Sequence, residues 1–185
     1  MRDQRPWPIS EPVPRGRRGE IAAAHPLPVE GCVEVAMSVE RLWEVFLDVP
    51  AWSQWNPCIW RATVRGGELR EGAKLVWAFN PIRPLYLYKL PAVAEIVELF
   101  AHQRVTWEVS APGFHALHSY RFAELDSGCC RFGSWEVAEG PAFHALRRFW
   151  LAHFRFVCDE SLAGARDLGP RPPVTGTGDR RARSG

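Results

Sequence analysis

A series of strand-like segments lies between an early amphipathic helix and a long final one, and this order limits the fold most strongly. The segments cover residues 59–66, 73–80, 92–100 and 104–110, and two more flank Asp126-Ser127-Gly128. They are rich in β-branched and aromatic residues, and turn-type sequences such as Gly66-Gly67 separate them. Short strands joined by short turns favour one antiparallel sheet.

Capping residues place the helices on either side of this sheet. A short strand at 32–37 precedes Ser38, which is a good N-cap for a helix that Pro50 ends. Residues 51–55 can form one more short helical turn before Asn56-Pro57. Near the C-terminus, Gly140-Pro141 opens a long helix. Apolar stripes follow both helices, through Leu42, Trp43, Val45, Phe46 and Val49 in the first, and Phe143, Leu146, Trp150, Phe154, Val157 and Ser161 in the last.

The order of elements therefore predicts an α+β fold. One apolar face of the antiparallel sheet needs a cover, and the long final helix is suited to provide it. We expect a curved sheet wrapped around this C-terminal helix, with two short helices after the first strand. Aromatic side chains between the two layers would then leave room for a pocket.

The chain of 185 residues fits one domain with tails. Residues 1–28 are rich in Pro and Arg without periodicity and predict a disordered leader, and residues 169–185 predict a disordered tail. The folded domain is expected at 29–168. Because no apolar run has the length of a signal peptide or a membrane span, we expect a cytoplasmic protein without a transmembrane segment. The sequence does not specify an oligomeric state.

Composition narrows the functional classes. Nine Trp and ten Phe, against three Tyr, supply enough ring surface for a large core or an apolar cavity. The net charge of +2, without a basic stripe, argues against nucleic-acid binding. The five cysteines are scattered and form no CxxC, so neither a zinc knuckle nor a redox motif is indicated, and no cofactor is expected.

The segment 114–136 predicts a hairpin whose register can be written down. A three-residue loop with Gly128 third pairs residues whose numbers sum to 254, so that His118 faces Glu136 and Tyr120 faces Ser134. Two arginines, Arg121 and Arg131, mark the opposite face as the solvent side. The inward face then carries Phe114, His118, Tyr120, Phe122, Phe132, Ser134 and Glu136.

His118 and Glu136 are the main polar candidates on this inward face. Facing each other they can hydrogen-bond, and a nearby carboxylate would favour the imidazolium form of His118. Three interpretations stay open: a structural polar pair, a group that orients a ligand, or an acid–base pair with Tyr120 as a further catalytic candidate. His115 lies three residues from His118, on the opposite face of a strand, so no metal site is expected.

Other segments leave alternatives open. Trp52, Trp55, Asn56 and Pro57 would form the mouth of a pocket or plug the end of the core. The segment 80–90 contains Arg83, Tyr86, Tyr88 and Lys89 and could form a lid. His153 lies near the apolar stripe of the final helix, where a histidine at the edge of the core is more usual than a catalytic base.

The chain resembles the START/Bet v 1-like helix-grip superfamily (SRPBCC), in particular bacterial polyketide cyclase/dehydrase-like proteins. The likeness spans about residues 32–165. It lies in VEVAMSVERLWEVFLDVPAWSQWNP, GAKLVWAF, VAEIVELFAHQRVTWEV and HSYRFAELDSGCCRFGSWEVAEG. The resemblance implies the helix-grip fold. Because the superfamily includes lipid carriers, cyclases, hydrolases and chaperone activators, it implies no shared catalytic set.

We therefore expect binding of a small hydrophobic or aromatic molecule, lipid- or polyketide-like, in a cavity between the sheet and the C-terminal helix. A polyketide cyclase or dehydratase using the His118–Glu136 pair is one alternative, and a protein-interaction module without a small ligand is another. The expected ligand-binding residues are Trp55, Trp77, Phe79, Trp107, His118, Tyr120, Phe122, Phe132, Ser134, Glu136, Phe143 and Trp150.

Overall fold

The computed structural model describes residues 28–79, 90–125 and 128–169. All but the last residue of the expected leader, and all but the first residue of the expected tail, lie outside these ranges. The expected lid residues Arg83, Tyr86, Tyr88 and Lys89 also lie outside them, as do Asp126 and Ser127 of the hairpin turn.

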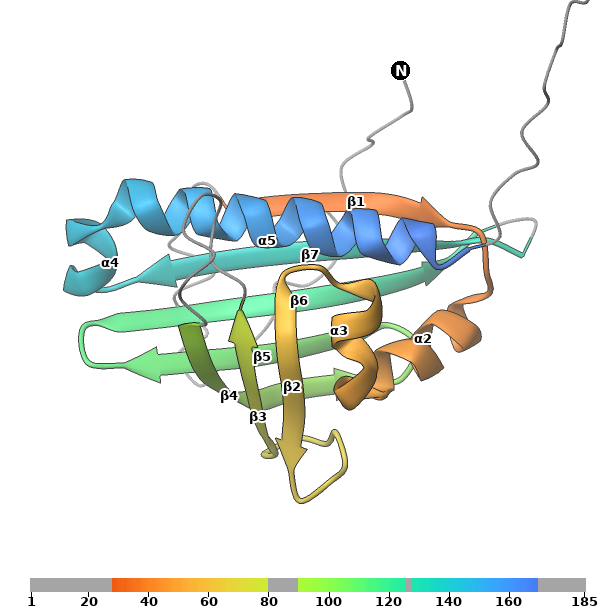
Figure 1. The fold of residues 1–185 in the computed structure, drawn as a ribbon, viewed down its shortest axis with the longest axis horizontal. Coiled ribbons are helices and arrows are strands. Elements are labelled where there is room, and N and C mark those ends of the chain that lie inside the picture. Colours follow the sequence, from red (N-terminus) through yellow and green to blue (C-terminus); the bar gives the residue numbers. More distant parts are fainter. Residues whose placement is uncertain (1–27, 80–89, 126–127, 170–185) are drawn as a thin grey trace, which may run out of the picture.

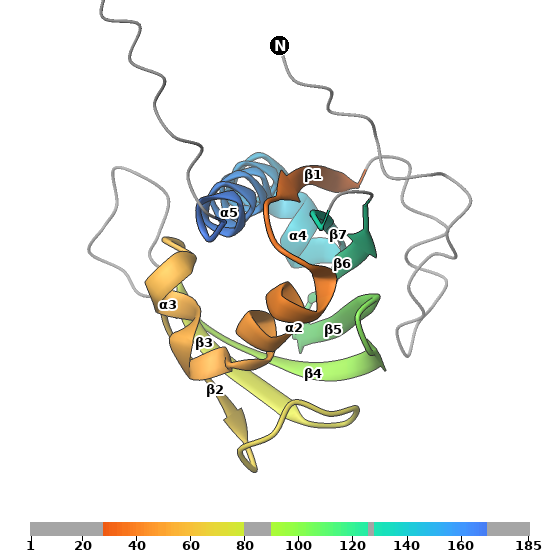
Figure 2. The same cartoon turned by 90° about the vertical axis from the view of Figure 1, so that its right-hand side faces the viewer.

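Seven antiparallel strands form one sheet in the order β1-β7-β6-β5-β4-β3-β2. Figure 1 shows the strands, and Figure 2 shows the sheet curling into an open arc from β1 to β2. The arc confirms the predicted curved antiparallel sheet. The strands are β1 Val29–Val35, β2 Ile59–Arg65, β3 Lys74–Phe79, β4 Leu90–Phe100, β5 Arg104–Ala111, β6 Phe114–Glu124 and β7 Cys130–Glu139.

The helices lie on the concave side of this arc (Figure 2). The first begins where predicted, because the Ser38 side chain accepts a hydrogen bond from the backbone N–H of Arg41. The last runs alongside β1 and covers the open side of the sheet (Figures 1 and 2). The helices are α2 Val39–Leu47, the 3-10 turn η1 Val49–Ala51, α3 Trp52–Trp55, α4 Pro141–Ala145 and α5 Arg147–Asp167.

The final helix differs from the prediction at Leu146. The chain leaves the helical conformation there, with φ −117° and ψ 29°, so a short α4 and a long α5 replace one continuous helix. Leu146 is 58% exposed and does not belong to the apolar stripe, contrary to the prediction. The bend turns the last helix, so that its apolar face begins at Trp150 and continues through Phe154 and Val157.

The register of the β6–β7 hairpin is confirmed. His118 pairs with Glu136, Tyr120 with Ser134 and Phe122 with Phe132. Gly128 has φ +70°, the left-handed conformation that the third residue of such a turn requires. The alternation of side chains along both strands then fixes which residues face the concave side of the sheet.

The convex face of the hairpin is more buried than the prediction of a solvent side implies. Arg121 is 8% exposed, and its guanidinium lies 5.9 Å from the centre of the Trp135 ring. Leu117, Trp135 and Val137 form a second, smaller apolar cluster there. An arginine stem can cover apolar surface while its charged head stacks on an aromatic ring. Arginine alone was therefore an unreliable marker of a solvent face.

The main core fills the space between α2, α3 and the central strands. Phe46 contacts the rings of Trp52, Tyr120, Phe122 and Phe132 at centroid distances of 5.0 to 6.2 Å. The indole N–H of Trp52 donates to the backbone carbonyl of Phe46 at 2.7 Å. Since Trp52 is 3% and Trp55 9% exposed, the structure favours the core plug over the pocket mouth for these tryptophans.

Candidate functional site

A cavity of about 400 Å³ lies between the sheet and α5. Strands β3 to β7 supply its walls on the sheet side, and about two turns of α5, from Trp150 to Val157, supply the other wall. This volume lies in the range of small-molecule sites. The large aromatic residues along it are Trp77, Phe79, Trp107, Phe114, Trp150 and Phe154.

The aromatic wall is held together by ring contacts. Trp77 lies 5.5 Å from Phe79 and 6.1 Å from Trp107, and Trp150 lies 4.5 Å from Phe114. Side-chain alternation places Trp77, Phe79 and Trp107 on the concave face of the sheet, and Trp150 approaches Phe114 from α5. Small residues, including Ala92 and Ala116, leave open the space that the rings surround.

His118 and Glu136 form the polar end of the cavity. Nδ1 of His118 lies 3.8 Å from Oε2 of Glu136, which is too long for a hydrogen bond, while its Nε2 lies 2.9 Å from the Ser134 hydroxyl. Burial lowers the pKa of His118 to about 3. Burial also raises the pKa of Glu136 to about 8. Both groups are therefore uncharged near neutral pH, and the expectation of an imidazolium is wrong because desolvation outweighs the neighbouring carboxyl group.

Tyr120 belongs to a different network. Its hydroxyl donates to the Ser161 hydroxyl at 2.9 Å, and the Asn56 amide donates to the same oxygen at 2.9 Å. Burial raises the pKa of Tyr120. The network ties β6 to α3 and α5, and Tyr120 is not among the residues that line the cavity.

His153 brings a second imidazole to the cavity from α5. It is 4% exposed, and its ring lies 5.0 Å from Phe79 in an edge-to-face arrangement. Burial lowers the pKa of His153 to about 4, so this ring is also neutral at neutral pH. Its Nδ1 atom is buried and has no hydrogen-bond partner among the described residues.

The expected ligand-binding residues fall into two groups. Six line the cavity, namely Trp77, Phe79, Trp107, His118, Glu136 and Trp150. The other six lie in the adjoining core or behind the wall, namely Trp55, Tyr120, Phe122, Phe132, Ser134 and Phe143, and all of them are buried. Ser134 reaches the site indirectly, through its hydrogen bond to His118.

Several lining residues were not among the expected ligand-binding residues. Phe154 and Val157 belong to the predicted apolar stripe that contains Trp150, and Phe114 belongs to the predicted inward face that contains His118. These three positions could be assigned to an inward face from periodicity alone. Ala92 and Val109 could not, because a small or ordinary apolar residue carries no functional signal until its neighbours are known.

His115 and His118 lie on opposite faces of β6, as strand alternation requires. Nε2 of His115 is 2.6 Å from Oε1 of Glu108 on the convex face. Within residues 28–79, 90–125 and 128–169, no three His, Cys, Asp or Glu side chains are grouped to hold a metal ion. The same residues contain no helix that is long and apolar enough to cross a membrane.

Known proteins with this architecture include a hypothetical protein of Helicobacter pylori, with TM-score 0.63 and 14% identity, covering 78% of this chain and 88% of that one. The ZhuI aromatase/cyclase of a Streptomyces species has TM-score 0.60 and 16% identity, with coverage of 77% and 92%. A START superfamily protein of Mycobacterium smegmatis has TM-score 0.52 and 16% identity, with coverage of 76% and 98%. At these identities the likeness shows the fold.

No curated protein matches the sequence. The model of one family, described as polyketide cyclase / dehydrase and lipid transport, matches residues 27–163. This match covers most of the chain and includes every strand and the cavity-lining part of α5. The chain therefore belongs to the polyketide cyclase / dehydrase and lipid transport family.

Proposed function

We propose that this protein binds a small, uncharged, largely aromatic molecule in the cavity between the sheet and α5. The observation that carries the proposal is the composition of the cavity wall. Six large aromatic side chains surround a space of about 400 Å³, and its inward-facing polar side chains, apart from the indoles, are His118, Glu136 and His153. The exposed Ser110 lies at the edge of this space, where its hydroxyl donates to Glu108 on the convex face. Such a site gains affinity from apolar contact and orientation from a few polar groups.

The protonation states support an uncharged ligand. His118 and His153 are neutral because burial lowers their pKa values to about 3 and about 4. Glu136 keeps its proton because burial raises its pKa to about 8. No Lys or Arg is among the described lining residues. A carboxylate or ammonium ligand would be desolvated here without a counter-charge, whereas a carbonyl or phenol oxygen could accept the Glu136 proton in a hydrogen bond.

Fluorescence titration with the neutral aromatic probe N-phenyl-1-naphthylamine tests this proposal. Ala92→Phe would add a ring inside the cavity, and we expect the probe to bind at least about tenfold more weakly. Ala78→Phe is a matched control, because Ala78 is also half-buried but neighbours Trp77 on the strand and so faces the other side of the sheet. Absence of binding by the wild type, or equal effects of both variants, would contradict the proposal.

A cyclase or dehydratase is the second candidate, and it is favoured by the state of Glu136. A carboxyl group with a pKa of about 8 on a cavity wall can donate a proton to a ligand oxygen at neutral pH and accept it again. His118, with a pKa of about 3, is a weak base and would position Glu136 or the ligand. The ZhuI aromatase/cyclase shares the fold.

Binding and catalysis can be separated with Glu136→Gln and His118→Ala. A poly-β-ketone analogue serves as the substrate, and affinity and turnover are measured on the same preparation. Loss of turnover in Glu136→Gln with affinity retained would favour the enzyme. Absence of turnover in the wild type, with affinity reduced in both variants, would favour the carrier.

A further inference from the structure

The sheet divides between β4 and β5 at one end. The pairing of these strands runs from Phe100–Arg104 to Glu95–Glu108, and within the described residues it extends no further toward Val93 and Ser110. Beyond this point, among the residues that the structure describes, Leu90–Ala94 pairs with β3 only. Val109–Ala111 likewise pairs with β6 only. Two neighbouring strands therefore diverge while each remains bonded to its outer neighbour.

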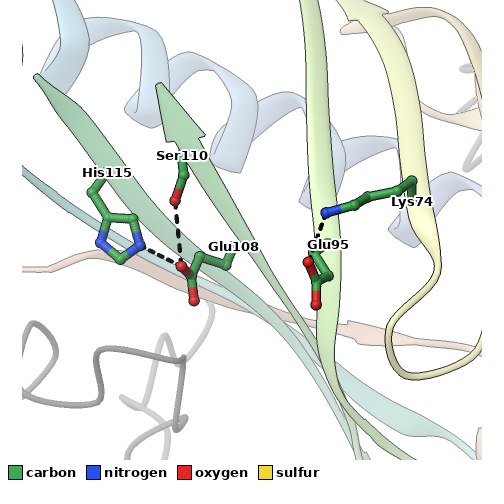
Figure 3. A network of polar contacts seen from close by, with 5 residues as sticks. All are labelled: Lys74, Glu95, Glu108, Ser110 and His115. Carbon is green, nitrogen blue, oxygen red and sulfur yellow. Dashed lines mark hydrogen bonds and ion pairs between the residues drawn. The ribbon is translucent and has the colours of Figure 1, made fainter. Parts of the chain in front are cut away.

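The side chains at the fork explain the division. Glu95 and Glu108 lie directly opposite each other, and like charges in that position disfavour pairing. Each carboxylate contacts a partner on the neighbouring strand that lies away from the division, β3 for Glu95 and β6 for Glu108 (Figure 3). The Lys74 ammonium is 2.6 Å from Glu95, and His115 Nε2 is 2.6 Å from Glu108. Pro91 also has no N–H to offer to a neighbouring strand.

The division joins the interior to the surface. Val93 on β4 and Ser110 on β5 line the internal cavity, and both also line a hollow of about 230 Å³ on the convex face beside Glu95 and Glu108. Val93 is 46% exposed although it is apolar. Pro91, Ser110 and Ala111, which also line the cavity, are exposed as well. The same two residues therefore border the cavity on one side and solvent on the other.

We propose that the ligand enters and leaves the cavity through this division between β4 and β5. The proposal rests on the proposed function, because it assumes a molecule in the cavity. Passage there breaks no ladder hydrogen bond between the described parts of β4 and β5, since their pairing ends at Glu95–Glu108, before Val93 and Ser110. The Lys74–Glu95 ion pair ties β4 to β3, and the His115–Glu108 hydrogen bond ties β5 to β6, while apolar Val93 faces the passing molecule.

Ser110→Phe and Val93→Phe test this entrance by narrowing it from either side. Both positions are exposed, so the added ring does not have to enter the core. Stopped-flow fluorescence with N-phenyl-1-naphthylamine measures association and dissociation in each variant. Thr63→Phe, at an exposed position on the distant strand β2, is the matched control. Thermal melts establish that each variant is folded.

An entrance has a specific kinetic signature. We expect both rate constants to fall by a similar factor, about tenfold, in Ser110→Phe and Val93→Phe, with Kd nearly unchanged. Wild-type rates in both folded variants would overturn the entrance and leave the proposed function standing. If only the dissociation rate constant changed, and Kd with it, the two residues would be ligand contacts, and this result would also overturn the entrance. If the wild type does not bind the probe, the proposed function itself fails.

Discussion

Oε2 of Glu136 lies 3.8 Å from Nδ1 of His118 at the polar end of the cavity, and burial favours the neutral form of both groups. The two side chains are 13% and 7% exposed. An ion pair at this position would have to recover the desolvation of two charges through one long contact. The neutral pair avoids that cost and leaves the Glu136 proton available to a ligand.

Glu136 and His118 should make the free energy of unfolding depend on pH in opposite directions. The pKa of Glu136 is raised from 4.5 to about 8, so its contribution is present below pH 4.5 and is lost as pH rises through 8. The pKa of His118 is lowered from 6.5 to about 3, so its contribution is lost as pH falls from 6.5 through 3. Each slope is at most about 1.4 kcal/mol per pH unit.

Chemical denaturation of Glu136→Gln and His118→Asn across this pH range checks the prediction. Relative to the wild type, Glu136→Gln should become increasingly more stable as pH rises from about 4.5 to about 8. His118→Asn should become increasingly more stable as pH falls from about 6.5 to about 3. Difference curves that are flat over these windows would show that the two groups keep their ordinary pKa values in the folded protein.

Ser161→Ala should destabilise the protein without weakening ligand binding. The substitution removes the common acceptor of the Tyr120 hydroxyl and the Asn56 amide, and leaving buried donors without a partner costs about 1–3 kcal/mol. Tyr120→Phe should cost less, because Ser161 keeps its bond to Asn56. Urea unfolding and probe titration are measured in parallel. If Tyr120→Phe weakened probe binding without changing stability, Tyr120 would belong to the ligand site and not to the core.

Gly164→Ala should be strongly destabilising although alanine is the better helix former. A Cβ at this position of α5 would overlap the backbone carbonyl oxygen of Trp55 and lie 3.0 Å from its carbonyl carbon. We expect a loss of about 2 kcal/mol or more, which exceeds the helix-propensity gain of about 1 kcal/mol. Gly31→Ala is the comparison, because its Cβ would meet the movable end of Leu162. Equal losses in thermal melts would contradict this account.

Phe132→Ala and Phe79→Ala should separate the core from the cavity wall. Phe132 is fully buried among Phe46, Tyr120 and Phe122, and its truncation should cost about 3–5 kcal/mol. Phe79 is half-buried and borders space that is already open, so its truncation should cost less than half as much but weaken probe binding. Unfolding and titration experiments measure both effects. If Phe132→Ala weakened probe binding more and Phe79→Ala cost more stability, the ligand would bind beside Phe132 and not beside Phe79.

Local patterns predicted the elements well where one residue type fixed the geometry. Ser38 placed the start of α2, and Gly128 with strand alternation fixed the His118–Glu136 pairing. The final helix was less accurate, because Leu146 fits a helical stripe in sequence but lies at a bend in the chain. Periodicity describes an ideal helix and contains no information about where the backbone turns away from it.

The candidate site was predicted as a cavity between the sheet and the C-terminal helix, but the sequence did not separate the residues that line it from those that fill the core. Phe132 and Trp107 are both inward-facing aromatics in the sequence pattern, yet Phe132 packs against α2 and α3 while Trp107 lines the cavity. Which ring borders open space depends on how α2, α3 and α5 cover different parts of the arc. That arrangement depends on many long-range contacts, and no single segment specifies it.

The sequence by itself determined the order of the strands and helices, the register of the central hairpin and the inward position of His118 and Glu136, because these follow from alternation, turns and caps within one segment. Only the tertiary structure decided the protonation of that pair, the extent of the cavity and the division between β4 and β5. Desolvation, open volume and the opposition of Glu95 to Glu108 arise between segments that lie far apart in the chain or on different strands. The interior of this protein, rather than any one motif, therefore sets its candidate chemistry.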